Sequence, residues 1–216
     1  MDFLFGDQNK KEIREYEKII SEIEKYEASI RSLSDDELRS KTKEFKERID
    51  SGEDLEEILP EAYAVAREGS RRFLGKRQYD VQLMGAIALH HGDVAEMRTG
   101  EGKTLTAPLA AYLNALTGNP VHIATANDYL ATRDCEDIRP LFEGLGLTVG
   151  VVTEERDRDP QVDRDNRKQA YNCDIIYGSS NAFAFDYLRD NTVTSSCSFP
   201  FHASAKGRRA VMQRSL

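Results

Sequence analysis

Apolar residues recur every three or four positions near the start of the chain, the spacing that makes one face of an α-helix apolar. Residues 9–31 carry such a stripe, and Lys and Glu residues occupy the opposite face. The stripe consists of Ile13, Tyr16, Ile19, Ile20, Ile23, Tyr26 and Ile30. It predicts a helix that either packs on the rest of the domain or docks on a partner or a membrane surface.

Two further helices are expected before residue 75. Ser34 and Glu37 have the spacing of a capping box, so a helix is predicted over residues 35–50. Another helix is expected to follow Pro60 and to end at Gly75. This part of the chain is charged and carries no catalytic chemistry of its own.

Predicted strands and helices alternate after Gly75. Strands are expected at "VAEM", "VHIATA", "LTVGVV" and "DIIYGSS", and helices at "VQLMGAIALH", "LTAPLAAYLNAL", "DYLATRDCEDIRPLFEGL" and "NAFAFDYLRD". Such alternation predicts a parallel sheet with helices on both faces. We therefore expect an α/β fold with a helical segment over residues 1–75, a nucleotide-binding domain over 76–192 and a disordered tail over 193–216.

Composition narrows the function classes. The net charge of −8 argues against a general nucleic-acid binder. The three cysteines are far apart and form no C-x-x-C motif, so reduced thiols are expected and a structural zinc site is not. No apolar run approaches about 18 residues, the length that a membrane span needs, and the start is too short and acidic for a secretion signal. A cytoplasmic protein is expected.

The segment "MRTGEGKT", residues 97–104, nearly matches the phosphate loop G-x-x-x-x-G-K-[ST], with Met97 in place of the first glycine. Glycines let backbone N–H groups approach phosphate oxygens, and a helix that begins near Lys103 adds its positive end. Lys103 can reach the β- and γ-phosphates, and the Thr104 hydroxyl can coordinate Mg²⁺. The pattern predicts a nucleoside triphosphate site.

Gln82 lies upstream of this loop in "KRQYDVQ". Its amide can pair with both the donor and the acceptor on the edge of adenine. A glutamine ahead of T-G-x-G-K-T is typical of the helicase-like superfamily of two-lobed motors rather than of GTPases.

Within that superfamily, the chain resembles the SecA family over about residues 10–192. The resemblance is carried by "YDVQL", "AEMRTGEGKTLTAPLAAYLNALTG", "NDYLATRD", "RPLFEGLGLTVG" and "YGSSNAFAFDYLRDN", and by "LSDDELRSKTKEFKERIDSGEDLEEILPEAYAVAREGSRR" upstream. The family's members are ATPases that drive preproteins through the bacterial Sec channel. The resemblance implies a partial RecA-like P-loop domain that uses ATP and Mg²⁺.

The resemblance also implies roles for individual residues. Gln82 is expected to read the adenine, Arg77 to flank the base, and Thr104 to bind the metal. The phosphate-binding stretch is expected to be Gly100, Glu101, Gly102, Lys103 and Thr104, of which Lys103 and Thr104 are the expected catalytic residues. "NDYLATRD" corresponds to a segment that couples the nucleotide lobe to substrate movement.

The implied partners are a SecYEG-type channel, preproteins and the acidic lipid surface on the cytoplasmic side of the plasma membrane. The stripe between Ile13 and Ile30 matches a region that contacts lipid and channel in the family. A homodimer is among the assemblies that the resemblance allows, and no nucleic acid is expected.

The chain departs from the family after Asn191. Hydrolysis in such motors needs a strand that ends in Asp-Glu, to hold Mg²⁺ and to activate water. The residues from Thr192 to Leu216 contain no Asp or Glu, and no apolar strand is expected there. Asn127 or Asp128 is expected to cap a helix rather than to bind metal. We expect a truncated or frame-shifted product that binds nucleotide weakly and hydrolyses it poorly.

Two other functions remain open from the sequence. One is a fragment of a superfamily-2-like nucleic-acid helicase. The other is a non-catalytic interaction module that uses the N-terminal helices to hold a channel or another protein.

Overall fold

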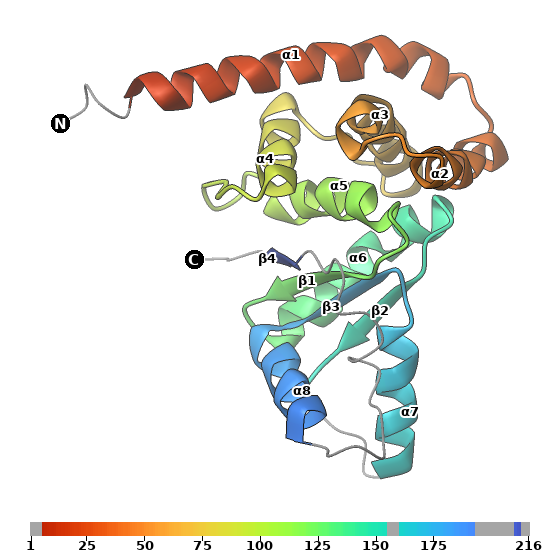
Figure 1. The fold of residues 1–216 in the computed structure, drawn as a ribbon, viewed down its shortest axis with the longest axis vertical. Helices are drawn as coiled ribbons and strands as arrows, with labels where there is room; N and C mark the ends of the chain where they lie inside the picture. The colour runs from red at the N-terminus through yellow and green to blue at the C-terminus, as the bar shows by residue number, and fades with distance from the viewer. Residues whose placement is uncertain (1–5, 155–159, 193–209, 213–216) are drawn as a thin grey trace.

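The computed structural model describes residues 6–154, 160–192 and 210–212. The helices are α1 (Gly6–Arg31), α2 (Asp35–Asp50), α3 (Leu55–Phe73), α4 (Asp80–His91), α5 (Lys103–Ala115), α6 (Asp128–Gly144), α7 (Pro160–Tyr171) and α8 (Ser180–Thr192). The strands are β1 (Val121–Thr125), β2 (Val149–Val152), β3 (Ile175–Ser179) and β4 (Ala210–Met212). Figure 1 shows α1 at the top, α2 to α5 below it, and the sheet with α7 and α8 at the bottom.

The strands form one parallel sheet in the order β2-β3-β1-β4. Side chains of β3 alternate between its faces, as a strand requires. Ile175 and Tyr177 join the main core with residues of α5 and α6, whereas Ile176 joins a smaller cluster with residues of α7 and α8. The predicted fold is confirmed: a helical N-terminal segment followed by a partial RecA-like P-loop parallel sheet with flanking helices.

Helix α2 has the predicted bounds and the predicted capping box. The Ser34 hydroxyl accepts a hydrogen bond from the Glu37 N–H at 3.3 Å, and the Glu37 carboxylate accepts one from the Ser34 N–H at 2.7 Å. Each bond satisfies a backbone donor that the helix start would otherwise leave without a partner.

The predicted start of the third helix is wrong. Helix α3 begins at Leu55, so Pro60 lies inside it. A proline removes one helical hydrogen bond. Ile58 and Leu59, which precede the proline, are fully buried, and their packing compensates for that loss.

The predicted strand at "VAEM" is also wrong: residues 93–98 lie in no strand. Val94 is 95% exposed, while Ala95 and Met97 lie close to Gly85 of α4. The segment therefore packs on a helix, and β4 takes the place beside β1 in the sheet. The expectation that no strand follows Asn191 is wrong, because Ala210–Met212 form strand β4. The disorder predicted for residues 193–209 and 213–216 concerns residues outside the described ones.

The apolar stripe of α1 is buried in the later part of the helix and exposed in the earlier part. Ile20, Ile23 and Ile30 are buried in the main core, so the packing interpretation holds for this part. Ile13 is 46% exposed and leaves the earlier part of the helix uncovered. Among the described helices, none is both long and apolar enough to cross a membrane.

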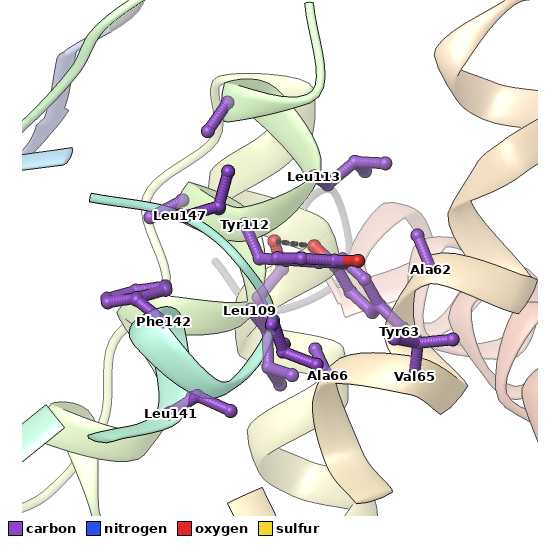
Figure 2. Packing of buried hydrophobic residues seen from close by; sticks show 14 of the residues in the cluster. Ala62, Tyr63, Val65, Ala66, Leu109, Tyr112, Leu113, Leu141, Phe142 and Leu147 are labelled. Carbon is purple, nitrogen blue, oxygen red and sulfur yellow. Dashed lines mark hydrogen bonds between the residues drawn. The ribbon is translucent and has the colours of Figure 1, made fainter. Parts of the chain in front are cut away.

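One hydrophobic core joins the N-terminal helices to the sheet. It contains residues of α1 to α6, β1, β2 and β3, so it continues across the domain boundary predicted at residue 75. Figure 2 shows Tyr63 of α3 and Tyr112 of α5 among the side chains of this cluster. Cys135 is a buried free thiol, and burial raises its pKa to about 11, consistent with the expected reduced state.

A buried hydrogen bond also crosses that boundary. Thr42 Oγ1 of α2 lies 2.8 Å from the hydroxyl of Tyr112, and both side chains are buried. We expect Thr42→Val to lower the free energy of unfolding by about 1–3 kcal/mol, because it leaves the Tyr112 hydroxyl buried without its partner. Urea unfolding measures the change.

The double variant Thr42→Val/Tyr112→Phe serves as the control. It removes both polar partners and should cost less than the sum of the two single variants. Additive costs would contradict the assignment of this bond as a link between the helical segment and the nucleotide-binding part.

Candidate nucleotide-binding site

The glycine loop turns directly into helix α5. Gly100 and Gly102 have φ angles of 87° and 83°, in the left-handed region that favours glycine. Gly102 is the N-cap of α5, and Lys103 and Thr104 are its first residues. The first N–H groups of a helix have no partner within it and carry partial positive charge. The loop therefore places a cation and a hydroxyl at an anion-binding helix end.

Glu101 holds the loop together from within. Its carboxylate accepts a hydrogen bond from the Arg98 N–H at 2.7 Å, and its own N–H donates to the Arg98 carbonyl at 3.3 Å. Glu101 is therefore a residue that shapes the turn.

A pocket of about 280 Å³ lies between the loop and the start of helix α6. Its lining from the loop side is Thr99, Gly100, Gly102, Lys103 and Thr104. Its lining from the other side is Thr125, Ala126, Leu130, Arg133 and Asp134. The volume is near the lower end of the range that is typical of small-molecule sites.

The far wall is positioned by the end of β1. Thr125 is the last residue of the strand, and Asn127 then caps α6, its side chain accepting a hydrogen bond from the Leu130 N–H at 2.9 Å. The cap predicted at Asn127 or Asp128 is therefore Asn127. The carboxyl ends of parallel strands meet at one edge, which is where ligands bind in open α/β sheets.

Arg133 and Asp134 form an ion pair on this wall. Both Arg133 Nε and Nη2 donate to Asp134 Oδ1, at 3.0 and 2.6 Å. The guanidinium lies 6.0 Å from the ring centroid of Tyr129, itself 72% exposed. Arg133 thus brings a second cation to the pocket, opposite Lys103.

Gln82 lies against the loop but is not part of the pocket lining. Its Nε2 donates to the Glu101 carbonyl at 2.9 Å, and its Oε1 accepts from the Tyr79 N–H at 2.9 Å. Gln82 is 4% exposed, and both ends of its amide are engaged within the protein. A β-carbon at residue 102 would lie 2.1 Å from Gln82 Nε2, so glycine lets the amide keep this position.

Arg77 is placed elsewhere. Its guanidinium donates to both carboxylate oxygens of Glu27 on α1, at 2.7 and 2.9 Å, and it does not line the pocket. A role for Arg77 beside the base stays a prediction.

The donor set suits a metal ion that arrives with a nucleotide. Among the described residues, no group of three or more His, Cys, Asp or Glu side chains could hold a metal. Mg²⁺ usually binds through one or two protein oxygens, the phosphates and water. Four side chains of the pocket lining offer oxygen atoms that could bind such an ion. They are those of Thr99, Thr104, Thr125 and Asp134.

The strand next to β1 brings no acidic pair. Strand β4 runs parallel to β1, so its carboxyl end lies at the same edge as Thr125. Gln213 and Arg214 follow it in the sequence, and neither is acidic.

Sequence reasoning missed Arg133 and Asp134 as pocket residues. They belong to "NDYLATRD", for which the family resemblance alone predicts a coupling role. The useful signal was topological, because a helix that follows a parallel strand starts at the same edge as the glycine loop.

The chain matches proteins of one family along most of its length. A family model described as the SecA DEAD-like domain matches residues 1–211. Protein translocase subunit SecA of Finegoldia magna is 56% identical over 190 residues, which are 88% of this chain and 20% of that relative. The protein of the same name from Gluconobacter oxydans is 54% identical over 188 residues, 87% of this chain and 20% of the relative. This chain thus spans 20% of the length of these relatives, and it belongs to the SecA family.

Proposed function

We propose that this chain binds ATP with Mg²⁺ in the pocket between the glycine loop and α6. The observation that carries the proposal is the placement of Lys103 and Thr104 at the open N-terminus of α5, facing that pocket. This arrangement concentrates positive potential and N–H donors where a triphosphate needs them.

Each residue has a distinct part in this proposal. Lys103 neutralises the terminal phosphates, and the loop N–H groups between Gly100 and Thr104 bind their oxygens. Thr104 holds the metal, which, when bound, neutralises charge on the phosphates. Arg133 adds charge from the opposite wall, and Gln82 reads the adenine edge.

We further propose that the nucleotide serves a motor that moves preproteins through a SecYEG-type channel. The family supports this role, since the relatives are named protein translocase subunits. In this proposal the protein is cytoplasmic and binds peripherally to the acidic lipid surface of the plasma membrane, either alone or as a homodimer. The exposed early part of α1, around Ile13, is a surface for such contacts.

Hydrolysis by this chain is proposed to be slow. Attack on the γ-phosphate needs a carboxylate that orients water, and residues 192–216 contain no Asp or Glu. The chain therefore acts as an ATP-binding unit with little turnover.

Lys103→Ala tests the proposal. We expect affinity for a fluorescent ATP analogue to fall between about tenfold and a hundredfold, the loss of one charge-assisted contact. Lys43→Ala is the matched control, because Lys43 is an exposed lysine of α2 whose contact is an ion pair with Glu47. Equal affinities for the wild type and Lys103→Ala, or turnover like that of an intact motor, would contradict the proposal.

Thr104→Val separates the metal from the phosphates. The variant keeps the side-chain shape and removes the hydroxyl that would coordinate Mg²⁺. We expect nucleotide affinity to fall in the presence of Mg²⁺ and to stay unchanged in EDTA. A loss of the same size in both buffers would show that Thr104 does not act through the metal.

Gly102→Ala tests the fit between the loop and Gln82. The new methyl group collides with the Gln82 amide and strains a left-handed residue, so we expect at least about a tenfold loss of nucleotide affinity. Gly118→Ala imposes similar strain, at φ 76°, in open space away from the pocket. It should lower stability and leave nucleotide affinity unchanged; a matching loss of affinity would refute the steric argument.

A further inference from the structure

Arg67 of helix α3 is a buried cation with partners in three parts of the chain. Its side chain is 2% exposed. Nε donates to the Gln78 carbonyl at 2.9 Å, Nη1 to Glu27 of α1 at 2.8 Å, and Nη2 to Asp80, the first residue of α4, at 2.9 Å. A buried guanidinium is costly unless it is paired in this way.

The geometry of these contacts depends on arginine. The planar guanidinium presents five N–H donors in a fixed fork, whereas a lysine ammonium is a single point charge on a flexible stem. Arg67 can therefore fix α1, α3 and the start of α4 relative to one another at once. Glu27 adds a second connection, because it also accepts hydrogen bonds from Arg77.

Residues 78–82, which Arg67 contacts at Gln78 and Asp80, are themselves hydrogen-bonded to the glycine loop and to α5. Gln78 is fully buried, and its Nε2 donates to the Leu105 carbonyl of α5 at 3.4 Å. The Tyr79 N–H then orients the Gln82 amide, which donates to the Glu101 carbonyl. Hydrogen bonds on either side of the peptide bond between Gln78 and Tyr79 thus connect Arg67 to the loop.

We propose that Arg67 is a positioning residue for recognition of the nucleotide base. It holds residues 78–82, and with them the orientation of the Gln82 amide on which base recognition depends, and Glu27 extends this restraint to α1. The inference rests on the proposed ATP-binding function. The inference divides the affinity for ATP into two contributions. Binding of the phosphates depends on the loop and α5, whereas binding of the base depends on Arg67 through Gln82.

Arg67→Met is the test variant, because methionine fills much of the same space without the charge or donors. We measure the dissociation constants of ATP, GTP and inorganic tripolyphosphate for the 216-residue chain. The wild type should prefer ATP to both other ligands. In Arg67→Met, ATP affinity should fall about tenfold, the equivalent of one or two hydrogen bonds, and tripolyphosphate affinity should stay unchanged.

Arg72→Met is the matched control. Arg72 lies on the same helix, and the partners of its guanidinium lie outside residues 78–82: it forms ion pairs with Glu68 and Asp35 and donates to the Arg31 and Leu33 carbonyls. Its loss should leave the preference for ATP over tripolyphosphate intact. Gln82→Ala should reproduce the loss seen in Arg67→Met, and the double variant should lose nothing more, because both changes remove the same interaction.

The outcomes separate this inference from the proposed function. Equal losses of ATP and tripolyphosphate affinity in Arg67→Met, or additive losses in the double variant, would overturn the positioning role. A wild type that binds neither ligand would instead overturn the proposed function.

Circular dichroism shows whether Arg67→Met is folded. If it is not, Glu27→Gln decides the matter, since Glu27 is 30% exposed and its replacement removes charge from one partner of the network. It should lower the preference for ATP by a smaller factor than expected for Arg67→Met, and an unchanged preference would overturn the inference.

Discussion

The contact between Gln82 and the backbone of Gly102 is the constraint on which the site depends. A β-carbon there would lie 2.1 Å from Gln82 Nε2, so any larger residue would displace the Gln82 amide from its hydrogen bond to Glu101. The same residue adopts a left-handed conformation and caps α5. One position thus sets where the loop ends, where the helix begins, and therefore where Lys103 and Thr104 lie.

The parallel sheet supplies the second half of the site. Strand β1 pairs with β3 from Val121 opposite Ile175 to Thr125 opposite Ser179. This register brings the end of β1, and hence the first turns of α6, to the edge at which the glycine loop lies. Arg133 and Asp134 face the pocket for that reason, although they are about thirty residues from Lys103 along the chain.

Local signals in the sequence were reliable, and signals that depend on distant partners were not. The capping box at Ser34 and the glycine loop predict correct helix starts, because the responsible atoms lie within three or four residues of one another. The strand predicted at "VAEM" is wrong because Ala95 and Met97 pack on α4, and β4 pairs with β1 in its stead. Arg67 was missed because nothing near it in sequence marks it as a buried cation; its partners are Glu27, Gln78 and Asp80.

The N-terminal helices belong to the nucleotide site in a physical sense. They share its core, and Arg67 joins Glu27 of α1 to the segment that carries Gln82. If Arg67 positions Gln82 for the base, then displacing α1 breaks two of the contacts that hold that segment, those of Glu27 with Arg67 and Arg77. Linkage is reciprocal, so a nucleotide that favours this orientation of Gln82 must also favour the docked position of α1, by the same free energy. The exposed early part of α1 and the glycine loop are then coupled through the position of α1. A ligand bound at one of them changes the affinity for a ligand at the other only if it binds the docked and the displaced helix with different affinities.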